Sequence, residues 1–190
     1  MKPIHITFLN GLDIEALAIT DAEIIAAIES SLGAQGRGET VIEPRVHLTP
    51  DPAVHGHFNV LRGYIGAPVN YAGVKIVSDY VYNNQQGLPS EMGILNLFDP
   101  ATGMPKAILD ATGITEMRTG AMTAVGAKYL ARKDSKILGH SARGGVPIGT
   151  SGCSTACSIS TKSGCISSAG KARRRSSPGW RPISASRCAA

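Results

Sequence analysis

The chain has 190 residues, a formal net charge of +5 and 43% hydrophobic residues, enough for one or two compact domains. The charge is unevenly divided: residues 1–140 carry 11 Lys and Arg against 14 Asp and Glu, whereas residues 141–190 carry eight basic residues and no acid. The body is therefore acidic, which argues against a nucleic-acid partner, and no apolar run reaches the roughly 20 residues of a membrane span.

A helix is the clearest element near the N-terminus. A weakly alternating segment at His5–Leu9 first predicts an entry strand. Thr20 and Glu23 then have the spacing of a capping box, in which each side chain satisfies a backbone N–H at a helix start. The glycine-rich stretch Gly33–Gly38 ends the pattern. The helix is expected to bury one face, on which the apolar residues recur every four positions: Ile24, Ile28 and Leu32.

Strands predominate in the middle of the chain. Short apolar runs bounded by turn residues predict strands at Arg45–Leu48, Phe58–Ile65, Val74–Val81, Ile94–Phe98 and Ala107–Leu109. The segment DPATGMPK, rich in Asp, Pro and Gly, predicts a hairpin connection between the last two. We expect these strands to be mostly antiparallel.

A second helix is predicted over about Thr112 to Arg132, followed by a strand at Lys136–Gly139. Its core face is expected to carry Ile114, Met117, Ala121, Val125 and Tyr129. The order of elements predicts an α/β fold, with a mixed α/β domain over residues 1–115 and a linking helix and strand over residues 116–140 that lead into a second domain.

Residues 141–190 differ in composition from the rest. They contain all four cysteines and 12 serines but no Leu, Phe, Tyr, Asp or Glu. Such a segment buries too little apolar area to offset the entropy of ordering it, so a basic, low-complexity, disordered tail is predicted. The cysteine spacing fits no zinc site and the N-terminus shows no export signal, so we interpret the cysteines as incidental and the protein as cytoplasmic.

Three cations lie in or beside apolar elements, where a charge needs a partner: Arg45, Lys75 and Arg118. If they converge on one pocket they suit an anionic group, because the arginine fork binds a carboxylate or phosphate with two parallel hydrogen bonds. The alternative is that each pairs with a nearby acid, namely Glu43, Asp79 or Glu116. The small residues after Arg118, Thr119 to Ala121, fit the approach of a ligand or of another helix equally well.

The chain resembles the ornithine cyclodeaminase/mu-crystallin family in segments that keep their order and spacing: PRVHL, GVKIVSDY, GLPS with GILNLFDP and TGMP, and TEMRTGAMTAVGAKYLAR leading to KILG. The resemblance covers nearly all of residues 1–140. It implies a substrate-binding and dimerisation domain, homodimers formed through that domain, a small amino-acid substrate, and a Rossmann domain that binds NAD or, as an alternative, NADP.

The resemblance also implies roles for individual residues. Arg45, Lys75 and Arg118 match the cations that bind the substrate carboxylate, and Lys75 is expected to act in catalysis. Ser90, Arg118 and Thr119 match positions that contact the nicotinamide cofactor. In the family's cyclodeaminases, hydride passes from the α-carbon of L-ornithine to NAD, the side-chain amine attacks the imine, ammonia leaves, and the hydride returns to give L-proline.

The chain departs from the family pattern in two places. The glutamate of strict ornithine cyclodeaminases is not matched in Val60–Gly63, which supports as alternatives a ketimine or pyrroline-carboxylate reductase or an alanine dehydrogenase. A non-catalytic, mu-crystallin-like binding protein is an alternative of another class. After Gly139 the glycine-rich phosphate loop is missing, and the tail has the composition of GC-rich DNA read out of frame. The expectation is a frameshift after His140 and a truncated, inactive chain.

Overall fold

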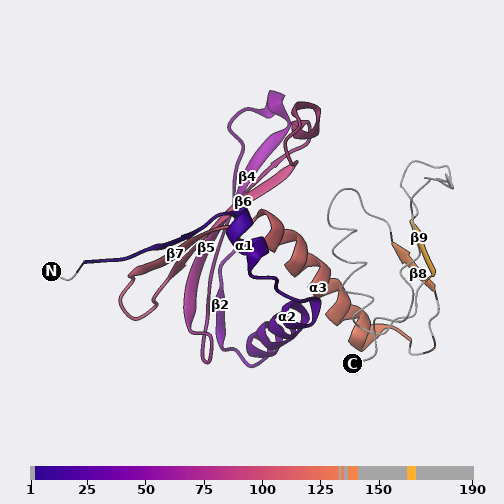
Figure 1. Cartoon of the computed structure of the whole chain (residues 1–190), viewed down its shortest axis with the longest axis horizontal. Helices are drawn as coiled ribbons and strands as arrows, with labels where there is room; N and C mark the ends of the chain where they lie inside the picture. The colour runs from indigo at the N-terminus through magenta and orange to yellow at the C-terminus, as the bar shows by residue number, and fades with distance from the viewer. Residues whose placement is uncertain (1–2, 133, 135–136, 141–161, 166–190) are drawn as a thin grey trace.

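The computed structural model describes residues 3–132, 134, 137–140 and 162–165. Its main body is a mixed α/β domain, in which one sheet carries two long helices (Figure 1). The strands of this body are β1 (Thr7–Leu9), β2 (Thr40–Ile42), β3 (Val46–Leu48), β4 (Gly56–Ile65), β5 (Tyr71–Tyr80), β6 (Glu91–Phe98) and β7 (Pro105–Asp110). The helices are α1 (Gly11–Ala16), α2 (Asp21–Gly36) and α3 (Thr112–Leu130). Two short 3-10 turns cover Pro52–Val54 and Asn83–Gln86.

The sheet has seven strands in the order β1-β7-β6-β5-β4-β2, and β3 also pairs with β4. Every pair in it is antiparallel except β1 with β7, which is parallel. The predicted hairpin joins β6 to β7, and the backbone N–H of Asp99 donates to the carbonyl of Met104 at its base. The mostly antiparallel group of strands is thereby confirmed.

The capping box of α2 is formed as predicted. The Thr20 hydroxyl accepts from the backbone N–H of Glu23, and the Glu23 carboxylate accepts from the backbone N–H of Thr20. The core of the domain lies where α2 meets α3, and Ile24, Ile28 and Leu32 pack against it as expected. Its buried members are Ile25, Ala121, Ala124 and Val125.

Small residues on α3 let the two helices approach closely. Ala121 is buried in this contact, and Gly120 beside it is also buried, so close helix packing explains Ala121. The expectation that Tyr129 joins the core is wrong, because its ring is 63% exposed and its hydroxyl donates to Glu29 of α2. Lys128 binds the same carboxylate, so the end of the contact is polar.

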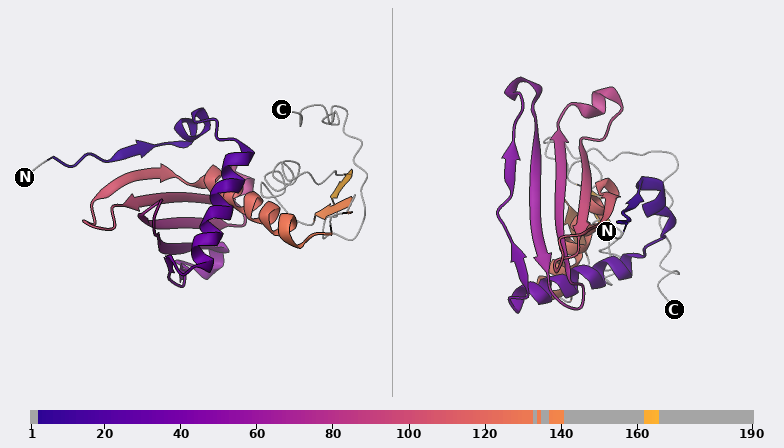
Figure 2. Two further views of the ribbon diagram at one scale, coloured as in Figure 1. Left: turned by 90° about the horizontal axis from the view of Figure 1, so that it is seen from below. Right: turned by 90° about the vertical axis from the view of Figure 1, so that its left-hand side faces the viewer.

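The two faces of the sheet have different surroundings (Figure 2). Alternate residues of a strand point to opposite faces, so Lys75 and Val77 share one face and Ile76 lies on the other. Val77 is 4% exposed beneath the helices, whereas Ile76 is 40% exposed. We call the covered side the helix face and the other side the open face.

After α3 the chain enters β8 (Ile137–His140), at the place where a strand is predicted. This strand pairs in parallel with β9 (Lys162–Cys165). The predicted division into residues 1–115 and 116–140 falls inside α3 and stays a prediction. The predicted disorder and frameshift concern a tail that, apart from β9, lies outside the described residues. Among the described helices, none is long and apolar enough to cross a membrane.

Candidate functional site

Lys75 lies in the middle of β5 and points to the helix face, where α3 holds its ammonium group. The Lys75 Nζ donates to the Thr115 hydroxyl at 3.2 Å, and that hydroxyl donates in turn to the Ala111 carbonyl at 2.7 Å. Thr115 is only 3% exposed, so this chain of hydrogen bonds is well sheltered. An ammonium group has three donors, and those not used by Thr115 are available to a ligand.

Arg118 lies one helical turn beyond Thr115 and brings a second positive charge to Lys75. Burial lowers the pKa of the Lys75 ammonium below its ordinary value, the Arg118 guanidinium lowers that pKa further, and the Glu91 carboxylate opposes both. Two like charges that lie close together disfavour each other. An anionic group bound between them would relieve this repulsion.

The predicted cations do not pair with the acids nearest to them in sequence. Glu43 forms its ion pair with Arg62, at 3.5 Å, and not with Arg45. The carboxylate that acts on Lys75 is Glu91. In the part of the chain that the structure describes, neither Arg45, Lys75 nor Arg118 has an ion pair within 4 Å. Their charges are therefore left for another partner.

Arg45 lies at the level of Lys75, two strands away. It directly precedes Val46, which is paired with Val60, while the next residue of β4, Leu61, is paired with Lys75. Arg45 lies outside β3, in the segment between β2 and β3 where the register with β4 changes, so strand alternation does not fix the face of its side chain. Its side chain is exposed, and within the described residues it makes no hydrogen bond or ion pair. The structure thus brings Lys75 and Arg118 together, whereas the convergence of Arg45 on them stays a prediction.

The predicted cofactor contacts lie near the same end of the sheet. Ser90 is exposed just before β6, and its carbonyl accepts from the backbone N–H of Tyr80 at 2.8 Å. Thr119 follows Arg118 on α3, and its hydroxyl donates to the Thr115 carbonyl at 2.7 Å. Ser90 and Arg118 thus offer exposed hydrogen-bonding groups, while the hydroxyl proton of Thr119 already has a partner.

Other polar residues of the helix face were not predicted as site residues. Glu91 begins β6, and His57 and Asn59 follow each other on β4, where the side-chain amide of Asn59 lies 3.1 Å from His57 Nε2. The Asn59 Oδ1 atom is buried without a hydrogen-bond partner. Two polar residues at i and i+2 within a strand are the sequence signal for these positions. No group of three metal-binding side chains occurs among the described residues.

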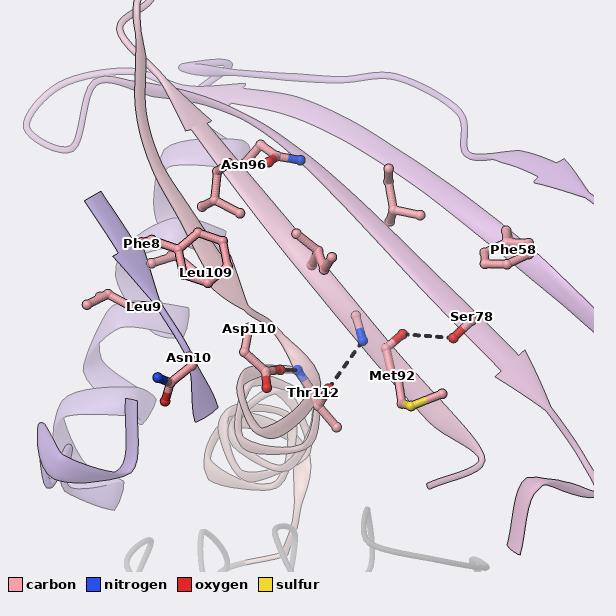
Figure 3. Close-up of a pocket in the computed structure, with 14 residues that line it drawn as sticks. Phe8, Leu9, Asn10, Phe58, Ser78, Met92, Asn96, Leu109, Asp110 and Thr112 are labelled. Atoms are coloured by element: carbon pink, nitrogen blue, oxygen red, sulfur yellow. Dashed lines mark hydrogen bonds between the residues drawn. The ribbon is translucent and has the colours of Figure 1, made fainter. Parts of the chain in front are cut away.

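The open face, on the other side of the sheet from these charges, carries a shallow hollow of about 690 Å³ (Figure 3). Most of its lining is apolar, and several of its polar groups have partners within the protein. The Ser78 hydroxyl donates to the Met92 carbonyl, and the Asp110 carboxylate accepts from the backbone N–H of Thr112. Such a surface is suited to packing against another apolar surface.

Known proteins resemble the chain in sequence and in fold. The model of the ornithine cyclodeaminase/mu-crystallin family matches residues 6–146. Alanine dehydrogenase of Archaeoglobus fulgidus is 35% identical over 131 residues, which are 69% of this chain and 38% of that protein. The structure of Thermococcus litoralis Delta(1)-pyrroline-2-carboxylate reductase in complex with NADH and L-proline has a TM-score of 0.79 and 31% identity, covering 85% of this chain and 49% of that one.

An archaeal alanine dehydrogenase dimer with bound NAD has a TM-score of 0.78 and 28% identity, over 85% of this chain and 48% of the solved one. The chain therefore spans about half the length of these solved relatives, and less than half of the curated relative.

Proposed function

The chain belongs to the ornithine cyclodeaminase/mu-crystallin family, and from this membership we propose that its described body is the substrate-binding domain of an NAD-dependent enzyme for small amino or imino acids. The observation that carries the proposal is the pair Lys75 and Arg118, two cations on the helix face that have no ion-pair partner within 4 Å among the described residues. A substrate carboxylate is the anion that both the family and this charge pattern favour.

The side chains have separate tasks in this proposal. Lys75, held by Thr115, places its remaining N–H donors against the carboxylate, and Arg118 adds its planar fork. Arg45 would close the clamp from the neighbouring strands. Each contact positions the α-carbon of the substrate and excludes water, and a bound carboxylate raises the pKa of Lys75 and keeps it charged.

The nicotinamide cofactor is proposed to be NAD, with NADP as the alternative. When bound, it accepts or donates the hydride at the substrate α-carbon. The exposed groups of Ser90 and Arg118 fit hydrogen bonding to its nicotinamide end, and Thr119 adds its backbone beside them. The solved relatives named above contain NADH or NAD, which supports this assignment.

Reversible hydride transfer at the α-carbon is our first proposal for the reaction, as in a dehydrogenase or reductase. The named relatives, an alanine dehydrogenase and a pyrroline-carboxylate reductase, support it. The conversion of L-ornithine to L-proline and ammonia is the second candidate. It is favoured by Glu91, which brings a negative charge near Lys75 where a second amine of the substrate could bind.

We propose that two copies of the chain associate through the open face. This face exposes large apolar side chains on adjacent strands, among them Ile76 and Ile94, which are paired across β5 and β6. Apolar surface of this kind is normally covered in a soluble protein. The dimeric state of the archaeal alanine dehydrogenase supports a second copy as the cover.

Titration of the isotope-labelled chain with L-proline, followed by NMR, tests the carboxylate clamp. We expect shifts around Lys75 and Arg118, and a loss of about tenfold or more in affinity in Lys75→Met or Arg118→Met, because each removes a charged hydrogen bond. Lys106→Met is the matched control, since Lys106 pairs with Asp99 at the β6–β7 hairpin. Binding that survives both site variants, or that Lys106→Met weakens equally, would refute the clamp.

A further inference from the structure

Glu91 lies at the end of the sheet where α3 begins. It is the first residue of β6 and is paired with Asp79 of β5. Alternation along β6 puts Glu91 on the same face as Leu95, the residue paired with Lys75. Its side chain is half-buried. Glu91 and Lys75 therefore point to one side of the sheet, from neighbouring strands.

Gly93, between Glu91 and Leu95, brings α3 onto this part of the sheet. A Cβ at that position would lie 3.5 Å from the Ala111 Cβ and 3.3 Å from the Ile76 carbonyl, so the start of α3 lies close against β6 where glycine has no side chain. The Gly93 N–H donates to the Thr112 hydroxyl at 3.2 Å and fixes the first turn of α3. This contact positions α3 so that Thr115 lies next to Lys75 and Arg118 lies on the following helical turn.

The charges of Glu91 and Lys75 do not neutralise each other by contact. Within the described part of the chain, Glu91 has no ion pair within 4 Å and its carboxylate accepts no hydrogen bond. Both groups lie on the helix face, on neighbouring strands, and the Glu91 carboxylate acts against the lowering of the Lys75 pKa. This side of the sheet therefore presents the positive groups of Lys75 and Arg118 together with one negative group.

We propose that Glu91 receives a protonated nitrogen of the same substrate whose carboxylate lies between Lys75 and Arg118. This inference rests on the proposed function. An amino acid carries both charges, and the site presents a partner for each. Either the α-nitrogen or a second, side-chain amine has the required chemistry. Glu91 would also supply, from a different strand, the carboxylate that is unmatched in Val60–Gly63.

Three ligands with the same five-carbon chain separate these contributions: pentanoate, L-norvaline and L-ornithine. Pentanoate has only the carboxylate, norvaline adds the α-amine, and ornithine adds a second amine. Their affinities for the full chain are measured by NMR titration, in wild type, Glu91→Gln and Asp79→Asn. Asp79 is the matched control, because it lies directly opposite Glu91 and its charge does not contribute to the lowered pKa of Lys75.

Glu91→Gln is expected to leave pentanoate binding unchanged or tighter, since a neighbouring negative charge is removed. A ligand whose nitrogen Glu91 holds should lose about tenfold in affinity, as for a hydrogen bond between charged groups. Loss for norvaline and ornithine alike assigns the α-nitrogen, and loss for ornithine alone assigns the second amine. Asp79→Asn should produce neither pattern.

The inference is overturned if Glu91→Gln changes all three affinities equally, changes none, or acts as Asp79→Asn does. Thermal unfolding of both variants shows whether each is folded under the titration conditions. Failure of the carboxylate clamp gives a different result, because wild-type binding of pentanoate would then be absent or insensitive to Lys75→Met. Intact pentanoate binding with no nitrogen-dependent loss refutes the role of Glu91 alone.

Discussion

Lys75 holds its proton less tightly in the folded protein than in the unfolded chain, because burial and Arg118 disfavour its charge. Between the lowered pKa of the folded state and the ordinary value of 10.5, the unfolded chain binds more protons. The free energy of unfolding therefore rises with pH through this window, and the unfavourable contribution of Lys75 is complete below it.

Lys75→Met should raise the free energy of unfolding at neutral pH, because it removes a charge that is costly to bury and keeps most of the apolar stem. In the variant, the free energy of unfolding should also rise less steeply with pH. Urea unfolding of both proteins from pH 7 to pH 10 measures this difference. If the two proteins show parallel pH profiles, Lys75 does not have a lowered pKa.

The effects of Arg118 and Glu91 on the pKa of Lys75 can be measured separately, because the two side chains carry opposite charges. Arg118→Met should raise the pKa of Lys75 by removing a like charge, and Glu91→Gln should lower it by removing an attractive one. The pKa is measured by NMR of the lysine side-chain atoms over a pH titration, with Lys106 as an internal reference. If the two substitutions moved the pKa of Lys75 in the same direction, this arrangement of charges would be contradicted.

Part of this site could be predicted from the sequence and part could not. Lys75 and Arg118 stand out because each is a charge within an apolar element. Glu91 does not, because its approach to Lys75 depends on the register between β5 and β6, which no local pattern fixes. Arg45 shows the converse, since its motif is clear but its side chain is exposed and its convergence on the other two cations stays a prediction.

At the scale of the element, the start of α2 depends on the capping box of Thr20 and Glu23. The Thr20 hydroxyl satisfies the backbone N–H of Glu23, and water must replace it in Thr20→Ala. We expect the free energy of unfolding to fall by about 1 kcal/mol. Thr123→Ala is the control, because that hydroxyl only bonds back to the Thr119 carbonyl within α3. Urea denaturation measures both variants, and equal losses would show that the cap is not responsible.

Elements with long periodic patterns are predicted well, whereas two of the short ones, β2 and α1, are not predicted. The helices α2 and α3 begin within a residue of their predicted positions, because capping and apolar spacing are local signals. The three-residue β2 has no such pattern and exists through its pairing with β4. Helix α1 did have a signal, since Asn10 and Asp13 form a capping box three residues apart.

The error at Tyr129 arises at the end of an element. Helical spacing predicts that residues Ala121, Val125 and Tyr129 share a face, and the first two are indeed buried. Periodicity does not show where the partner surface turns polar. At that point Glu29 binds the Tyr129 hydroxyl and Lys128, so an aromatic ring remains exposed.

At the scale of the whole molecule, the two faces of one sheet serve different purposes. The helix face carries Lys75 and Glu91 and lies on the side of α2 and α3 (Figure 2), and the open face exposes apolar side chains such as Ile76 and Ile94. Substrate binding and association of subunits are therefore separated by the thickness of a single sheet. A change on one face can be made with little direct effect on the other.

Ile94 lies near the middle of the open face and is 52% exposed, so Ile94→Glu should place a charge where the second subunit packs. Burial of an unpaired carboxylate is strongly unfavourable, and we expect the dimer to dissociate at concentrations where the wild type is associated.

Leu130→Glu is the control, since Leu130 is 87% exposed at the end of α3 and belongs to no sheet face. Sedimentation velocity over a concentration series measures both variants. A stable interface covers about 800 Å² on each partner, so one charge near its centre should act much more strongly than one outside it. If the wild type is monomeric, or if the two variants behave alike, a second copy does not cover the open face and the proposed dimer is refuted.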